Sequence, residues 1–173
     1  LVFCNTKIEC AEVAAQLCRE GMVAVALHGD LEQLHRNQTL IRFANGSANV
    51  LVASDVAARG LDIEAVDVVF NYSLPAQPEV YTHRIGRTGR GGEAGSALSL
   101  VADREMNRLQ AIEAFSDQGP MPMLQLPDHS PDGPLAEPQY VTLEVNGGRR
   151  HKLRPGDIPV SYTHLRAHET SDY

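Results

Sequence analysis

Short apolar runs alternate with amphipathic stretches along the first two thirds of the chain. Continuous apolar runs are typical of strands in a parallel sheet, because helices cover both faces of such a sheet. The runs predict strands, in chain order, at residues 1–4, 23–27, 50–53, 66–70 and 97–101. The stretches between them predict helices near residues 6–20, 30–43, 79–85 and 103–115. The expected fold class is therefore α/β, with a parallel sheet and helices on both of its faces.

Polar residues at the expected helix ends support this pattern. Thr6 with Glu9 three positions later fits a capping box, and Asp30 with Gln33 is a second candidate pair. Gly21 is placed to end the first helix. Each of these residues lies where the apolar pattern begins or stops.

The composition changes after residue 116, which predicts three further segments. Six of the ten prolines fall between residues 117 and 138, as expected for an extended linker. Residues 139–159 begin with strand-like alternation and continue into a basic stretch, which favours a truncated α+β domain, since so short a unit rarely folds alone. Residues 160–173 fit no preceding pattern and resemble translated sequencing-adapter sequence, so we expect a non-native tail.

Composition excludes some classes of protein and leaves others open. The formal net charge of −7 gives no general indication of nucleic-acid binding, so any such function must rest on local basic residues. No apolar stretch reaches the length of a membrane span. Three cysteines without a C-x-x-C pair favour buried thiols in a reducing cytoplasm. Because the chain opens on Leu1 inside an apolar run, we expect a fragment whose natural start lies upstream.

A glycine-rich basic segment at residues 81–92 is the strongest chemical signal. Arg84, Arg87 and Arg90 recur every three residues and would project from a similar side of a helix. Arginine suits a phosphoryl group that develops charge, because its planar fork donates two parallel hydrogen bonds and stays protonated. A solvated basic loop is the alternative. Ligands of parallel sheets bind beyond the carboxyl ends of strands, which selects the loops at residues 5–7, 28–30 and 54–55.

Residues 83–90, His-Arg-Ile-Gly-Arg-Thr-Gly-Arg, closely resemble motif VI of the DEAD-box RNA helicases. Other segments resemble further motifs of that family in the expected order, over residues 1 to about 116. They are residues 2–7 (motif IV), 28–36 (motif IVa and the loop before it), 51–62 (motif V) and 71–75 (the segment that follows it). The resemblance implies a RecA-like helicase C-terminal domain.

The resemblance also implies roles for individual residues. Arg87 and Arg90 would be arginine fingers on the γ-phosphate of ATP, and Gly60 and Asp62 would bind the nucleotide, Asp62 at the ribose. His83 and Arg84 would couple the nucleotide site to RNA. The residues expected to contact the RNA backbone are Thr6, Gly29, Arg36 and Ser54, of which Ser54 replaces the usual threonine but keeps a hydroxyl.

The resemblance implies that ATP and Mg²⁺ are bound mainly by an N-terminal RecA-like domain outside these residues. The 173 residues contain neither a G-x-x-x-x-G-K-[ST] phosphate loop nor Asp-Glu-Ala-Asp, and we expect no metal site among them. Alone, the chain is therefore expected to be inactive.

Residues 141–158 resemble the start of the RNA-binding domain of bacterial DbpA-type helicases. That similarity implies ribosomal RNA as a partner and a role in assembly of the large ribosomal subunit. Two alternatives remain open: a non-catalytic RNA-binding fragment, and a DNA-acting superfamily 2 motor. A parent without a phosphate-loop domain would favour the first. DNA-stimulated ATP hydrolysis would favour the second, although His83 and Thr88 argue against it.

Overall fold

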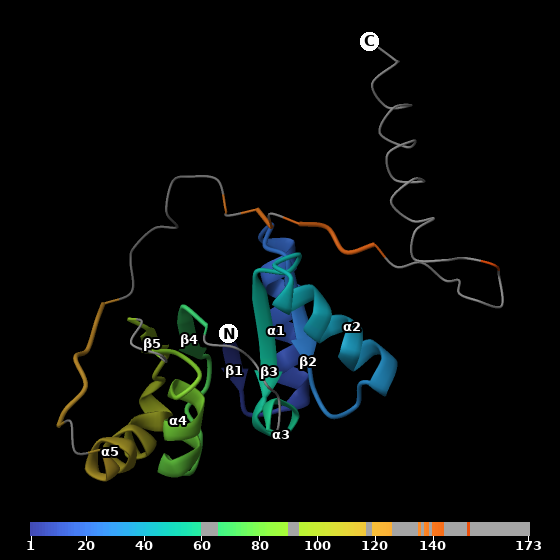
Figure 1. The fold of residues 1–173 in the computed structure, drawn as a ribbon. Coiled ribbons are helices and arrows are strands. Elements are labelled where there is room, and N and C mark those ends of the chain that lie inside the picture. Colours follow the sequence, from blue (N-terminus) through green and yellow to red (C-terminus); the bar gives the residue numbers. More distant parts are fainter. Residues whose placement is uncertain are drawn as a thin grey trace. The chain divides into compact units, whose positions relative to one another are not determined.

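A computed structural model describes residues 1–59, 66–89, 94–116, 119–125, 135, 137–138, 140–143 and 152. The strands are β1 (Val2–Cys4), β2 (Ala24–Leu27), β3 (Val50–Ser54), β4 (Val68–Asn71) and β5 (Ser96–Ser99). The helices are α1 (Lys7–Arg19), α2 (Gln33–Ala44), α3 (Asp55–Ala58), α4 (Pro78–Ile85) and α5 (Met106–Phe115), with a 3₁₀ turn at Asp103–Glu105. The predicted α/β class with a parallel sheet is confirmed (Figure 1).

The described strands form one parallel sheet in the order β2-β3-β1-β4-β5. β3 pairs with β1 through Val52 and Val2, and with β2 through Leu51 and Val25. On the other side of β1, Val2 is in register with Phe70 of β4. All five strands run the same way, so their carboxyl ends meet at one edge of the sheet.

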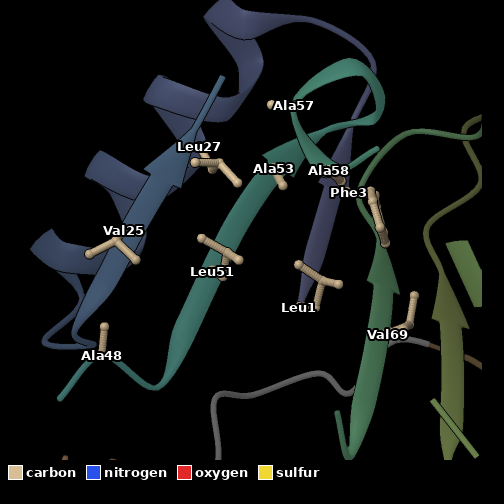
Figure 2. Packing of buried hydrophobic residues seen from close by; sticks show 10 residues of the cluster. All are labelled: Leu1, Phe3, Val25, Leu27, Ala48, Leu51, Ala53, Ala57, Ala58 and Val69. Atoms are coloured by element: carbon tan, nitrogen blue, oxygen red, sulfur yellow. The ribbon is translucent and has the colours of Figure 1, made fainter. Parts of the chain in front are cut away.

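Side chains alternate between two apolar layers, as the pleat of a strand requires. On one face, Cys10 and Ala14 of α1 pack with Val52 of β3 and Cys4 of β1. The opposite face carries a larger cluster built from odd-numbered strand positions, including Phe3, Leu27 and Leu51, against which Leu40 and Phe43 of α2 pack. Figure 2 shows this second layer, with Ala57 and Ala58 of α3 closing its carboxyl end.

A third apolar cluster joins α4 and α5. Leu74, Tyr81, Leu109 and Ile112 are buried together there. Met121, beyond the end of α5, packs against the same cluster. α4 is thereby held from both sides, by this cluster and by the sheet.

The predicted helix signals have mixed outcomes. The capping box of Thr6 and Glu9 is confirmed, and Gly21 follows the end of α1 with φ of +90°, a conformation that glycine adopts without strain. The proposed pair of Asp30 and Gln33 is wrong. Glu32 is the N-cap of α2 and makes no side-chain cap bond, whereas Asp30 forms an ion pair with Lys7.

Other elements differ in detail from the sequence prediction. The last helix is divided into the 3₁₀ turn and α5, and the short helix α3 was not foreseen. Cys4 and Cys10 are buried as expected, but Cys18, on the last turn of α1, is exposed. Among the described residues, no helix is both long and apolar enough to cross a membrane.

The chain divides into two units, Leu1–Thr142 and Leu143–Tyr173. Residues 140–143 are described and are not in a strand, although the sequence predicted one at 140–145. Most of the expected RNA-binding segment, and the whole of the expected tail at 160–173, lie outside the described residues.

Candidate functional site

The candidate site lies at the carboxyl edge of the sheet, between β1 and β4. From β1 the chain continues through α1 toward β2, whereas from β4 it continues through α4 toward β5 on the opposite side. Neighbouring parallel strands whose connections diverge leave a crevice at their carboxyl ends, where ligands of such folds bind. Asn5 follows β1, and Asn71 and Ser73 lie at and beyond the end of β4.

Arg84 of α4 fills this crevice and is only 1% exposed. Its Nε and Nη2 donate to the two carboxylate oxygens of Asp55, at 2.6 and 2.7 Å. Nη1 donates to Asn71 Oδ1 at 3.2 Å and to the Ser73 carbonyl at 2.8 Å. Nη2 also donates to Asn5 Oδ1 at 2.8 Å. All five N–H groups of the guanidinium therefore have acceptors.

This network makes Arg84 the link between three segments. It joins α4 to the loop after β1, to the first residue of α3 and to the end of β4. The ring of Phe3 lies 5.2 Å from the guanidinium carbon, which adds a cation–π contact. A buried charge is tolerated only when it is paired and hydrogen-bonded, and Asp55 with the amide oxygens meets both conditions.

The predicted common orientation of the arginines is wrong. α4 ends at Ile85 with Gly86 as its C-cap, so Arg87 lies in the following turn rather than on the helix. The Arg87 backbone donates to the Arg84 carbonyl and accepts from the Val66 amide, at 3.1 and 3.0 Å. Arg84 points into the protein, while Arg87 lines an adjacent cleft. Arg90, Gly60 and Asp62 lie outside the described residues.

The cleft beside Arg84 has a volume of about 210 Å³. It brings together two further arginines and a histidine, on a floor made by the Arg84–Asp55 pair. The lining residues are Phe3, Asp55, Ala58, Arg59, Val80, His83, Arg84 and Arg87. Asp55 is paired with Arg84, and Arg59 and Arg87 bring two further guanidinium groups to the lining, the group best suited to hydrogen-bond an anionic ligand.

The side chain of Thr88 anchors the turn that carries Arg87. Its hydroxyl lies 2.5 Å from the Val66 carbonyl and 3.0 Å from the Asp67 carbonyl. Gly89 follows with φ of +63°. Gly95 packs so closely beneath the turn that a Cβ there would overlap the Thr88 hydroxyl and the Gly89 amide.

The four residues predicted to contact RNA gather at the same edge. Thr6 follows β1, Gly29 follows β2 and Ser54 ends β3, so they come from three adjacent strands. Thr6 and Gly29 are exposed, whereas Ser54 is 7% exposed. Arg36 of α2 is half-buried and its Nη2 donates to the Ala57 carbonyl at 2.6 Å, which ties α2 to α3.

An ion pair that the sequence did not predict joins two of these loops. Lys7 Nζ lies 2.7 Å from Asp30 Oδ2, and the hydrogen bond from Lys7 lowers the pKa of the Asp30 carboxyl below its ordinary value. Both side chains are exposed, so the pair adds little to stability. The pair does hold the ammonium group of Lys7 beside Thr6.

Two thiols lie beneath the site without taking part in it. The hydrogen bond with the Cys10 side chain, and then burial, raise the pKa of the Cys4 thiol. Cys4 is fully buried, so it stays protonated and is no nucleophile.

Sequence reasoning missed the acceptors that orient Arg84. Asn5 and Asp55 stand in loops selected as strand ends, but no local pattern connects them with Arg84 or with Asn71. The partners come together only through the strand order, which places β1 between β3 and β4.

Comparison with known proteins agrees with this geometry. The family described as "Helicase conserved C-terminal domain" matches residues 1–92. The chain is 48% identical over 159 residues to the ATP-dependent RNA helicase DbpA of Escherichia coli, covering 91% of this chain and 34% of that protein. It is 43% identical over 144 residues to the DEAD-box ATP-dependent RNA helicase CshA of Bacillus subtilis, covering 83% of this chain and 28% of CshA.

Solved structures of DEAD-box proteins share the fold. The E. coli DEAD-box protein SrmB, solved bound to regulator of ribonuclease activity A, superposes with a TM-score of 0.66 at 35% identity, covering 74% of this chain and 80% of that one. A DEAD-box protein from Methanococcus jannaschii gives a TM-score of 0.63 at 44% identity, covering 66% of this chain and 31% of that one. The chain therefore belongs to the helicase conserved C-terminal domain family, and within it to the DEAD-box RNA helicases. It spans about a third of the length of DbpA and about a quarter of CshA.

Proposed function

We propose that the chain is the C-terminal motor domain of an ATP-dependent RNA helicase, and that its cleft meets the γ-phosphate of ATP held by an N-terminal RecA-like domain. The observation that carries the proposal is the position of Arg87. It lines a cleft together with Arg59 and His83, and the floor of this cleft is fixed by the fully hydrogen-bonded Arg84. A guanidinium on a rigid support is the arrangement that stabilises charge on a transferring phosphoryl group.

His83 and Arg84 act in this proposal as the coupling between nucleotide and RNA. His83 lines the cleft. Arg84 contacts Asn5, which is next in sequence to Thr6, one of the residues proposed to contact RNA. A shift of α4 on nucleotide binding would move the loop after β1 through that hydrogen bond. Arg84 would thus act through its partners rather than by touching either ligand, because it is buried.

The RNA backbone would follow the edge formed by the loops after β1, β2 and β3. Thr6, Gly29, Arg36 and Ser54 supply hydroxyl, amide and guanidinium donors suited to phosphate and sugar oxygens. The hydroxyl of Thr6 already caps α1 by accepting from the Glu9 amide at 3.1 Å, and it donates to Glu9 Oε2 at 3.4 Å, a contact that a phosphate oxygen would have to replace.

Other parts of the proposal rest on the family. Arg90 would be the second finger, and Gly60 and Asp62 would bind the nucleotide. Mg²⁺ would be held by the N-terminal domain. Among the described residues, no three His, Cys, Asp or Glu side chains gather as a metal site, so no step is assigned to a metal on this chain.

The subfamily proposal is a DbpA-type helicase. It is supported by the similarity to E. coli DbpA, which extends over 91% of this chain. The partner would then be ribosomal RNA, and the process would be assembly of the large ribosomal subunit in the cytoplasm.

The decisive experiment is a chimera in which this chain replaces the matching region of E. coli DbpA. Arg87→Lys keeps the charge but loses the two-pronged fork, so kcat at saturating RNA should fall by up to about 10³-fold, equivalent to about 4 kcal/mol of transition-state stabilisation. RNA affinity without nucleotide should be unchanged. Arg19→Lys, on the exposed last turn of α1, is the matched control.

Other results of the chimera experiment would each change the proposal. Unaltered kcat in Arg87→Lys, or weaker RNA binding as its sole defect, would remove Arg87 from the phosphoryl site. A folded chimera without RNA-stimulated turnover would favour a non-catalytic RNA-binding role. Stronger stimulation by DNA than by RNA would favour the DNA-acting motor.

A further inference from the structure

The described residues beyond α5 contact the domain at separate places. The first is near α4 and α5, where the Met121 amide donates to Glu113 Oε1 at 2.8 Å and the Tyr81 hydroxyl lies 3.4 Å from Met121 Sδ. Proline-rich composition had indicated an extended linker over residues 117–138. These contacts belong to the unit Leu1–Thr142.

Two further contacts lie at the amino-terminal edge of the sheet. Leu135 Cδ1 is 3.4 Å from the position that a Cβ on Gly21 would occupy, and Tyr140 Cδ2 is 3.6 Å from the same position on Gly46. Gly21 precedes β2 and Gly46 precedes β3, which are paired neighbours. Figure 1 shows the orange segment crossing the end of the domain where these strands begin.

The last contact is a closed set of side-chain hydrogen bonds. Asn45 Nδ2 donates to Thr142 Oγ1 at 3.0 Å, and the hydroxyls of Thr142 and Ser47 are in hydrogen-bond contact. The Ser47 hydroxyl in turn donates to Asn45 Oδ1 at 2.7 Å, and the Arg42 carbonyl at 3.2 Å is a second acceptor for the same proton. With Thr142 donating to Ser47, the ring uses each hydroxyl once as donor and once as acceptor.

The loop is built to hold this ring. Asn45 Oδ1 also accepts from the Ser47 amide at 3.0 Å, and Gly46 between them adopts φ of +74°. Ser47 is only 6% exposed, so its hydroxyl needs partners within the protein. The turn Asn45–Ser47 is therefore held by its own hydrogen bonds, and the segment beyond α5 contributes a single hydroxyl, that of Thr142.

We propose that the loop Asn45–Ser47 is a docking site for this chain's own segment Tyr140–Thr142, which fixes the point at which the polypeptide leaves the domain. The docking matters because of where the loop Asn45–Ser47 lies in the sheet. β3 spans five residues, or about 17 Å, between this loop and Ser54 at the functional edge. Thr142, the last residue of the first unit, is therefore held at the edge of the sheet opposite the cleft.

The test uses the complete 173-residue chain with three variants. Thr142→Val preserves shape and removes the hydroxyl, Thr142→Ser retains the hydroxyl, and Asn45→Ala removes the receptor amide. Chymotrypsin cleavage after Tyr140, followed by mass spectrometry, reports how often the segment leaves the loop, since cleavage tracks the open population. Thr142→Val and Asn45→Ala should each be cleaved about tenfold faster, and Thr142→Ser should resemble the wild type.

A second measurement separates docking from general loosening. The side-chain amide resonances of Asn45 in ¹H–¹⁵N spectra should shift in Thr142→Val, with resonances of α1 unchanged. The double variant should be cleaved no faster than either single one, because both remove the same contact. Equal cleavage rates in all variants, or additive effects in the double variant, would overturn the proposal.

Discussion

Arg84 shows how a single side chain can belong to a functional motif and still be part of the core. Its guanidinium is buried, and every donor has an acceptor within 3.2 Å. Such a charge is stable only while its carboxylate partner is present. Its role is therefore to position the neighbouring segments, and Arg87 is the arginine that reaches the cleft.

Asp55→Asn tests this role. It keeps the shape but removes the charge that balances Arg84, and should lower the free energy of unfolding by about 3 kcal/mol, toward the low end for broken buried pairs because Asp55 is 25% exposed. Urea unfolding followed by circular dichroism measures the change. Asp30→Asn breaks the exposed pair with Lys7 and serves as the matched control, which should leave the midpoint unaltered. Equal behaviour of the two variants would mean that Arg84 does not depend on Asp55.

The sequence identified Arg84 as part of a motif but could not give its orientation. A spacing of three residues places arginines on one side only while the helix continues, and here α4 stops at Ile85. The acceptors Asn5 and Asn71 are 79 and 13 residues away from Arg84, and local patterns carry no information on such contacts. For the same reason the ion pair between Lys7 and Asp30, 23 residues apart, was not foreseen.

Elements were predicted more reliably than side-chain partners. Each predicted apolar run became a strand within one or two residues, because a short apolar run is a clear local signature, even for β5, whose described side chains are mostly exposed. The four-residue helix α3 was missed because so short an element has no period to detect. The turn after α4 likewise depends on close packing between segments rather than on its own sequence.

Gly95→Ala tests that packing. The added Cβ would overlap the Thr88 hydroxyl and the Gly89 amide, so the turn must move. We expect a loss of about 1–3 kcal/mol in unfolding free energy and reduced turnover of the chimera, because Arg87 belongs to the displaced turn. Gly29→Ala is the control for stability alone, since no atom lies within 4 Å of its added Cβ. If Gly95→Ala matched Gly29→Ala in stability and the unsubstituted chimera in turnover, the turn would not depend on this contact.

The described residues combine a five-stranded parallel sheet with only part of the proposed reaction site. They supply the cleft lined by Arg59 and Arg87 and the edge proposed to contact RNA. The phosphate loop and the Asp-Glu-Ala-Asp residues of the family's reaction are absent from all 173 residues. An arginine finger stabilises charge on a phosphoryl group that other residues must first bind and orient.

This division predicts that the purified chain folds cooperatively yet hydrolyses no ATP above a buffer blank, with or without RNA. A coupled phosphate-release assay at saturating ATP and Mg²⁺ measures the rate, and a thermal melt establishes that the sample is folded. The DbpA chimera is the positive control, because it joins the same residues to a phosphate loop. RNA-stimulated turnover by the chain alone would contradict the prediction only if it disappeared in Arg87→Lys, since a contaminating ATPase would not respond to that substitution. In that event the cleft would bind and orient the nucleotide by itself, and the proposed division of the site between two domains would have to be abandoned.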